Sequence, residues 1–311
     1  MSAMKQLTIL MYHYVRPIKK SIYPGIKGLE FESFKRQLDY LSNIHTFITA
    51  EQLIAYSLGN QELPLKPCYL TFDDGFKDHI DYVMPELLSR NIQGSFFPPA
   101  DAIVKREMLD VHAVHFILAS TSDYHALVVE LNGAYREYGG TTSNLESLQN
   151  TWYIASRYDS AEIMYVKHML QHALPLHIRS QIVAKLFKKY VGRTQSDFAE
   201  ELYISTLDTK TLIENGMYVG SHGCRHLWLN KEPKSSQILE IDLSLQFLKK
   251  VGAPTKDWIM CYPYGAYNNN TLNILKSKNC SIGLTTKSGF ADLDQSNMLE
   301  LRRFDTNDFP Q

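Results

Sequence analysis

Hydrophobic residues recur along this chain in two patterns, one typical of buried strands and one typical of amphipathic helices. The run LTILMYHYV at 7–15 is almost continuously apolar and predicts a buried strand. Over 30–44 the apolar side chains fall three or four positions apart, which predicts a helix. A second helix is predicted over 49–59, because Thr49 and Gln52 have capping-box spacing and Gly59 ends the segment.

The order of the elements favours a parallel α/β fold. Strands predicted at 68–74 and 93–100 flank a helix at 80–91, so the first hundred residues follow a β-α-β-α-β order, which is typical of a parallel sheet or a barrel. Residues 103–200 contain helix-like segments and no strong strand signal, which predicts a helical insertion within a single domain spanning 1–311. Strands and helices alternate again from 207 to 308.

Composition narrows the class of protein. The chain has 311 residues with 32 basic and 33 acidic side chains, so no basic excess is available for a nucleic-acid partner. Its four cysteines lack the spacing of a zinc knuckle and are expected to be reduced thiols. The N-terminal run resembles a first strand more than a signal peptide, and no run of 18 apolar residues occurs. The sequence therefore predicts a cytoplasmic protein without a transmembrane segment.

Two neighbouring carboxylates, Asp73 and Asp74, follow the apolar strand YLTF. Their like charges repel, and each loses hydration beside a buried strand, so a compensating cation is expected. His222 and His226 lie four positions apart after the strand-like run YVGS, and on a helical turn both imidazoles can meet one metal ion. A chance pair on a surface helix has the same spacing. Together the residues suggest a hydrolytic metal set in which one carboxylate binds metal and the other is the base.

A third feature is the run CYPYG at 261–265, where Pro263 and Gly265 predict a turn after a strand. Such a turn can present a backbone N–H inward to an oxyanion. An ordinary surface turn has the same composition, so this feature is informative only beside the other two.

The three features together resemble a known family. TFDDG (71–75), SHGCRH (221–226) and YPYG (262–265) are similar, in the same order, to the first three motifs of the polysaccharide deacetylases, the NodB-homology enzymes. The resemblance covers about 7–100 and 207–308. It implies metal-dependent hydrolysis of an N-acetyl group on a sugar, and a distorted, incomplete (β/α) barrel of about seven strands.

The resemblance also implies a role for each matching residue. By position, Asp73 would be the general base, while Asp74, His222 and His226 would bind one divalent ion, which is usually zinc in this family. The main-chain N–H of Tyr264 would help to hold the oxyanion.

Two functional groups of the family pattern are missing from this sequence, and other residues would have to replace them. The third motif of the family usually begins with an arginine that orients the base, but this chain has Cys261 there, and Arg303 or Arg225 would have to take over. The late Leu-x-His-Asp motif, which supplies the acid for the leaving amine, has no counterpart, since His226 is the last histidine.

The N-terminus suggests a source for the acid. MYHYV (11–15) resembles the early Tyr-His of the poly-N-acetylglucosamine deacetylases of biofilm matrices, whose motifs are circularly permuted, and this implies His13 as general acid. The alternative is a hydrogen-bonded histidine packed in a strand. LRRFDTND (301–308) resembles the closing strand of such members, in which Asp305 would orient a catalytic side chain.

The sequence thus predicts a metal-dependent hydrolase that removes an N-acetyl group from an amino sugar. For a cytoplasmic enzyme the substrate would be an oligosaccharide or a precursor of surface polysaccharide, since mature polymers lie outside the cell. One alternative is a hydrolase of another C–N amide, such as an N-formyl sugar or an allantoin-like substrate. The other is a non-catalytic glycan-binding relative, but a binder has no need of a base beside a metal. The oligomeric state is not predicted.

Overall fold

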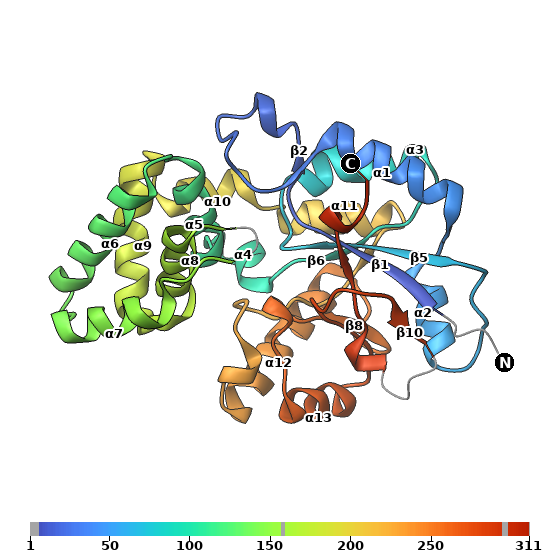
Figure 1. The fold of residues 1–311 in the computed structure, drawn as a ribbon. Helices are drawn as coiled ribbons and strands as arrows, with labels where there is room; N and C mark the ends of the chain where they lie inside the picture. The colour runs from blue at the N-terminus through green and yellow to red at the C-terminus, as the bar shows by residue number, and fades with distance from the viewer. Residues whose placement is uncertain (1–5, 157–158, 294–297, 311) are drawn as a thin grey trace. The chain divides into compact units, whose positions relative to one another are not determined.

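The computed structural model describes residues 6–156, 159–293 and 298–310 (Figure 1). The chain forms two compact units. The first comprises the residues up to Pro17, Gly28–Arg106 and the residues from Glu201 onward, and the second comprises Ile18–Lys27 and Glu107–Glu200.

The first unit is built on a seven-stranded sheet. Its main path runs through β10 (Ala291–Asp292), β1 (Gln6–Tyr12), β5 (Pro67–Asp73), β6 (Ser95–Phe97) and β7 (Tyr218–Val219), while β11 (Phe304–Asp305) pairs with β1 and β4 (Thr46–Phe47) with β5. All these pairs are parallel except β1 with β10. The chain therefore has the expected mixed α/β fold with a parallel sheet.

Further parallel pairings involve the strands outside this sheet. They join β2 (Val15–Arg16) to β3 (Leu29–Glu30), and β8 (Trp258–Cys261) to β9 (Cys280–Leu284). Single parallel bridges connect Ser221, just after β7, with Met260 in β8, and Leu284 in β9 with Leu301, just before β11. Parallel pairings can thus be followed from β1 through β5, β6, β7, β8 and β9 to β11, which pairs with β1 again.

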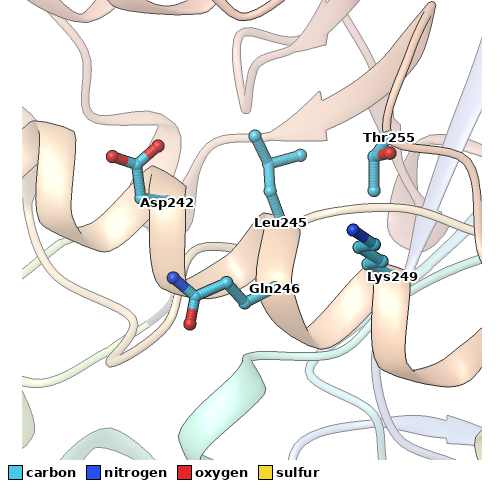
Figure 2. Close-up of a pocket in the computed structure, with 5 residues that line it drawn as sticks. All are labelled: Asp242, Leu245, Gln246, Lys249 and Thr255. Atoms are coloured by element: carbon cyan, nitrogen blue, oxygen red, sulfur yellow. The ribbon is translucent and has the colours of Figure 1, made fainter.

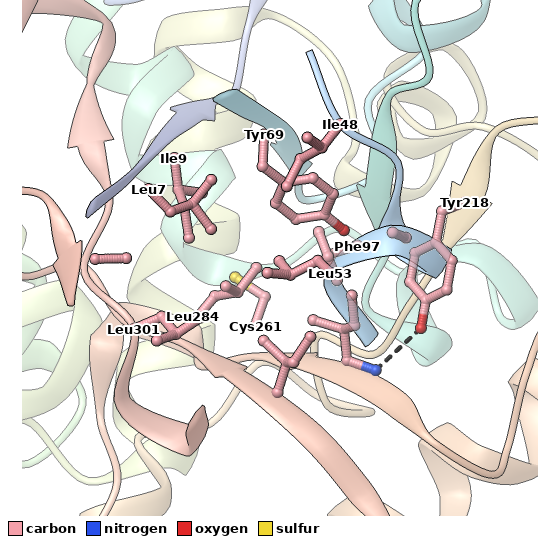
Figure 3. Packing of buried hydrophobic residues seen from close by; sticks show 14 of the residues in the cluster. Leu7, Ile9, Ile48, Leu53, Tyr69, Phe97, Tyr218, Cys261, Leu284 and Leu301 are labelled. Atoms are coloured by element: carbon pink, nitrogen blue, oxygen red, sulfur yellow. Dashed lines mark hydrogen bonds between the residues drawn. The ribbon is translucent and has the colours of Figure 1, made fainter. Parts of the chain in front are cut away.

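One face of these strands packs into a hydrophobic core (Figure 3). Leu7 and Ile9 of β1 lie two residues apart and so point to the same face, and Tyr69 of β5 joins them there. Asp73 lies four residues after Tyr69, on the same face of β5. Cys261 of β8 is itself a member of this core. The face of β5 that packs into the core therefore changes from apolar at Tyr69 to polar at Asp73, where the strand ends.

Helices in the first unit connect the strands. They are α1 (Phe31–Ile44), α2 (Ala50–Ser57), α3 (Met84–Ser89), α4 (Ala100–Val104), α11 (Thr206–Glu214), α12 (Lys234–Val251) and α13 (Asn269–Ser277). The predicted capping box of α2 is confirmed, because the side chains of Thr49 and Gln52 each accept a backbone N–H of the other. The helix predicted at 80–91 is in two parts, a π-helical turn (His79–Val83) followed by α3.

The second unit is helical. It contains α5 (Asp110–Ala119), α6 (Tyr124–Glu137), α7 (Thr142–Trp152), α8 (Ala161–His168) and α9 (Leu176–Val191), and α10 (Gln195–Leu202) runs past its end. α5 packs against α8 and α9. The short segment Ile18–Lys27 joins this unit because the ring of Tyr23 packs against those of Phe116 and Phe198.

Two general expectations concern the described residues as a whole. None of the described helices combines the length and hydropathy that a membrane span needs. The four cysteines, Cys68, Cys224, Cys261 and Cys280, are buried free thiols.

Candidate active site

Polar side chains gather where β1 and β5 end beside each other. The two strands are parallel, with Met11 of β1 paired to Thr71 of β5. Asp73 is the last residue of β5, Asp74 follows it with a φ of 74°, and His13 follows the end of β1. The carboxyl ends of parallel strands meet at one edge, which is where α/β enzymes carry their reactive groups.

Asp74, His222 and His226 present three ligand atoms to one point. Oδ1 of Asp74 lies 3.5 Å from Nε2 of His222 and 3.4 Å from Nε2 of His226. A zinc ion with tetrahedral ligands at about 2.0–2.2 Å would separate those ligands by about 3.3–3.6 Å. The donor set and its spacing therefore fit a divalent ion, as the sequence predicts for these three residues.

The ring of His222 is oriented by a main-chain carbonyl. Its Nδ1 lies 2.8 Å from the carbonyl oxygen of Cys261. Because a carbonyl only accepts, Nδ1 carries a proton, and Nε2 is the ring nitrogen that faces Asp74. A histidine that ligates a metal through one ring nitrogen usually donates from the other in this way.

The two histidines do not share a helical turn, so that part of the prediction is wrong. Ser221–His226 is a loop, and α12 begins only at Lys234. Gly223 and His226 have φ values of 72° and 57°, in the left-handed region, and such residues end a right-handed helix. The bend in the loop, rather than helical periodicity, brings both imidazoles to Asp74.

Asp73 is buried and held by a two-bond fork from Arg303. Nη1 of Arg303 donates to Oδ1 at 3.0 Å, and Nη2 donates to Oδ2 at 2.9 Å. Burial alone would raise the pKa of Asp73, but the charges of Arg303, His222 and His13 outweigh it and lower the pKa to about 2. Asp73 is therefore an ionised acceptor at neutral pH.

Of the two arginines considered as replacements at the base, the structure brings Arg303 to Asp73. Arg225 instead forms a salt bridge with Glu240. Sγ of Cys261 lies 3.3 Å from Oδ2 of Asp73, so Asp73, His222 and Cys261 form a second group of potential ligands. The guanidinium of Arg303 already supplies a cation to this group, which disfavours a second metal ion there.

His13 approaches both carboxylates from a more exposed position. Its Nε2 lies 3.9 Å from Oδ2 of Asp73 and 3.9 Å from Oδ2 of Asp74, and its side chain is 40% exposed. The carbonyl of His13 accepts a hydrogen bond at 3.1 Å from Nε2 of His79. Burial lowers the pKa of His79 to about 4, so this ring is neutral and carries its proton on Nε2.

Tyr264 lies beside a candidate ligand. It has a φ of 58° within the short turn Pro263–Gly265, and its ring centroid is 4.6 Å from that of His226. Asp305 pairs through its backbone with Met11 of β1, and its side chain accepts the backbone N–H of Asn307 and caps the turn Thr306–Asp308. Its hydrogen bonds within the described residues do not join it to the cluster of carboxylates and histidines.

Two residues near the site were not singled out by the sequence. Thr71 Oγ1 accepts from Nη1 of Arg303 at 3.0 Å, and Glu240 accepts backbone N–H groups from the loop between the histidines. Glu240 did carry a signal, because it is a charged residue on the buried stripe of α12. Thr71 carried none, since threonine is common in strands.

An open pocket lies on another face of α12 (Figure 2). Its lining residues are Asp242, Leu245, Gln246, Lys249 and Thr255. At 100° per residue, the four on α12 lie on the side of the helix opposite Glu240. None of the five belongs to the candidate site.

Part of the chain matches a known protein family. Residues 183–282 match the family model of polysaccharide deacetylase, a range that includes His222, His226 and Tyr264 but not the two aspartates. A comparison with curated protein sequences gave no significant match.

Solved structures with a similar fold span nearly the whole chain. The Streptococcus pyogenes deacetylase PplD in complex with acetate aligns with a TM-score of 0.59 and 17% identity over 97% of this chain and 93% of its own. IcaB from Ammonifex degensii aligns with a TM-score of 0.57 and 18% identity over 96% of this chain and 91% of its own. The BpsB deacetylase domain from Bordetella bronchiseptica aligns with a TM-score of 0.55 and 13% identity over 96% of this chain and 95% of its own.

These findings confirm the resemblance inferred from the motifs. Residues 183–282 are similar to the polysaccharide deacetylase family, and nearly the whole chain shares the fold of the solved structures that align with it.

Proposed function

We propose that this protein is a metal-dependent hydrolase that removes an N-acetyl group from an amino sugar. The observation that carries the proposal is the spacing of Asp74, His222 and His226, which fits a divalent ion directly beside the ionised Asp73. Zinc is the first candidate because two imidazoles and one carboxylate form a common catalytic zinc set. When bound, such an ion polarises the amide carbonyl and lowers the pKa of a water molecule.

The side chains of this protein would handle the protons and the developing charge. Asp73, held in orientation by Arg303, would take a proton from the attacking water. His13 would give a proton to the departing amine. The main-chain N–H of Tyr264 would donate to the oxyanion. Asp305 caps the turn that follows Arg303, so we assign it an orienting effect through that segment only.

The proposal extends to the fold. The parallel pairings that lead from β1 through β9 to β11 and back support a distorted, incomplete (β/α) barrel of about seven strands. In this description residues 1–311 form one deacetylase domain, and the helices within 103–200 form an insertion in it.

We further propose a cytoplasmic location and a substrate that is an oligosaccharide or a surface-polysaccharide precursor. The four buried free thiols support a reducing compartment. Nucleotide- or lipid-linked sugars are the precursors that an enzyme would meet there. Cell fractionation with an antibody to the protein would test the location directly.

A mass-spectrometric screen of the purified chain would test the activity. It would use N-acetylated nucleotide sugars and oligosaccharides, each paired with its N-formyl counterpart. Release of acetate, with appearance of the free amine, would support the proposal. Release of formate alone would favour the deformylase alternative. A protein that binds metal and glycan but releases neither acid would instead be a glycan-binding relative.

We expect Arg303→Ala to destabilise the fold strongly as well as to impair catalysis. Arg303 and Asp73 are each 1% exposed, and removal of one partner leaves a buried charge unpaired, which costs about 3–5 kcal/mol. The folded pKa of Asp73, about 2, lies below its unfolded value of about 3.9, so the stabilisation is present above that value and is lost as pH falls toward 2.

Urea unfolding at neutral pH would measure the loss of stability. Arg302→Ala is a matched control, because it removes an exposed neighbouring arginine. Equal unfolding midpoints for the two variants would contradict the inferred importance of the buried fork.

A further inference from the structure

A buried carboxylate contacts the loop that carries both candidate histidine ligands. Glu240 on α12 is 0% exposed. Its Oε2 accepts the backbone N–H of Cys224 at 3.1 Å and that of Arg225 at 2.9 Å. Its Oε1 accepts from Nε of Arg225. All three donors belong to the segment between His222 and His226.

The loop needs such support because its backbone is unusual. Gly223 and His226 both have positive φ values, and a non-glycine residue in that region is strained unless its surroundings hold it. On its other side the loop is bonded by α4, where the N–H of Ala100 donates to the carbonyl of Gly223 and that of Asp101 to the carbonyl of Cys224. The loop N–H groups bonded to Glu240 and the loop carbonyls bonded to α4 thus fix the path of the chain between the two histidines.

We propose that Glu240 is a positioning residue for the metal site, which sets the separation of His222 and His226 before the ion binds. This inference rests on the proposed function. Burying a carboxylate costs free energy unless it is paired and hydrogen-bonded, and here every hydrogen bond of Glu240 within the described residues goes to the ligand loop. Preorganised ligands bind an ion more tightly, because less ordering remains to be done on binding.

The informative substitution is Glu240→Gln. An amide of the same shape has one acceptor oxygen and one donor NH2 in place of two acceptors. Whichever way it turns, its NH2 faces either the two backbone N–H groups or Nε of Arg225, so at least one donor loses its partner. Arg225→Ala keeps the two backbone bonds and removes only the side-chain partner, so its effect should be smaller.

The control is Gln237→Ala on the same buried stripe of α12. Gln237 is also 0% exposed, but it bonds the carbonyl of Glu232 and the hydroxyl of Thr271, not the ligand loop. The substitution Gln237→Ala therefore removes a buried polar group from the same helix without removing a contact to the candidate site.

The experiment measures zinc affinity of the metal-stripped full chain by competition with a chelating dye, together with the melting temperature and amide exchange of the metal-free protein. Loss of a group that orients metal ligands typically costs 10–100-fold in affinity. We expect Glu240→Gln to raise the zinc dissociation constant by about that factor and to speed exchange at Cys224 and Arg225. Gln237→Ala should lower the melting temperature without either effect.

The outcomes separate this inference from the proposed function. Zinc affinity and loop exchange that match the wild type in Glu240→Gln would overturn the positioning role alone. Equal losses of affinity in Glu240→Gln and Gln237→Ala would also overturn it, because the effect would then be general destabilisation. A wild-type protein that binds no divalent ion would overturn the proposed function, and the positioning role with it.

Discussion

A His222→Ala/His226→Ala variant is expected to lose its divalent ion and its hydrolytic activity together. Two of the three ligand atoms disappear, and the remaining carboxylate of Asp74 binds a divalent ion no better than an isolated surface carboxylate does. The purified wild-type protein should contain about one divalent ion per chain, and elemental analysis of the variant should show it gone. Activity on the substrate found in the acetate screen should fall to the background of the uncatalysed reaction.

The second unit offers a matched control. His168 and His172 are also four positions apart, and Nδ1 of His168 lies 2.8 Å from Nε2 of His172. Within the described residues neither belongs to a group of three potential ligands. His168→Ala/His172→Ala should therefore keep the ion. Full metal occupancy in a folded His222→Ala/His226→Ala protein would end the assignment of these ligands.

The residues of the candidate site could be named from the sequence because their signals are local. Asp73 and Asp74 lie at the end of a strand, and a carboxylate pair there needs a counter-charge wherever the rest of the chain lies. The same holds for the α2 capping box, whose Thr49 and Gln52 are three residues apart. Features fixed within a few residues of chain are those that a pattern can predict.

The choice between Arg303 and Arg225 could not be made in that way. Arg303 reaches Asp73 across 230 positions of sequence, through β11 and the pairing of β11 with β1. No short-range pattern reports such a contact. The position that resembles the family arginine is filled by Cys261, whose Sγ contacts Asp73 as well. Because cysteine is shorter than arginine, Cys261 on β8 leaves room beside Asp73 for Arg303, which comes from the C-terminal part of the sequence.

The boundary of the second unit also depends on distant contacts. Ile18–Lys27 has no helical or strand signal that links it to residues beyond 107, yet Tyr23 packs against Phe116 and Phe198. Lys27 forms a salt bridge with Asp159. Such packing of aromatic rings and ion pairs depends on three-dimensional proximity, which hydrophobic periodicity does not encode.

His13→Ala is expected to lower turnover by about 10²–10⁴, because proton transfer by a placed side chain typically contributes that factor. The reaction expels an amine, and an unprotonated amine anion is a very poor leaving group, so an acid must reach the nitrogen. Asp73 is ionised and cannot start as that acid, since its pKa is lowered to about 2. His222 and His226 are assigned to the ion. Among the described residues, His13 is the remaining histidine within 3.9 Å of these carboxylates, and its ring is partly exposed toward solvent.

Steady-state kinetics and elemental analysis of the same samples would separate loss of the acid from loss of the site. We expect the value of kcat to fall in His13→Ala while metal content and melting temperature stay close to those of the wild type. His45→Ala is a suitable control, because His45 is a histidine of the same unit whose Nδ1 bonds the carbonyl of Lys66 away from the site. Near-normal turnover in His13→Ala would mean that Asp73 returns the proton it took from water. The inference that a permuted N-terminal histidine replaces the missing late motif would then be wrong.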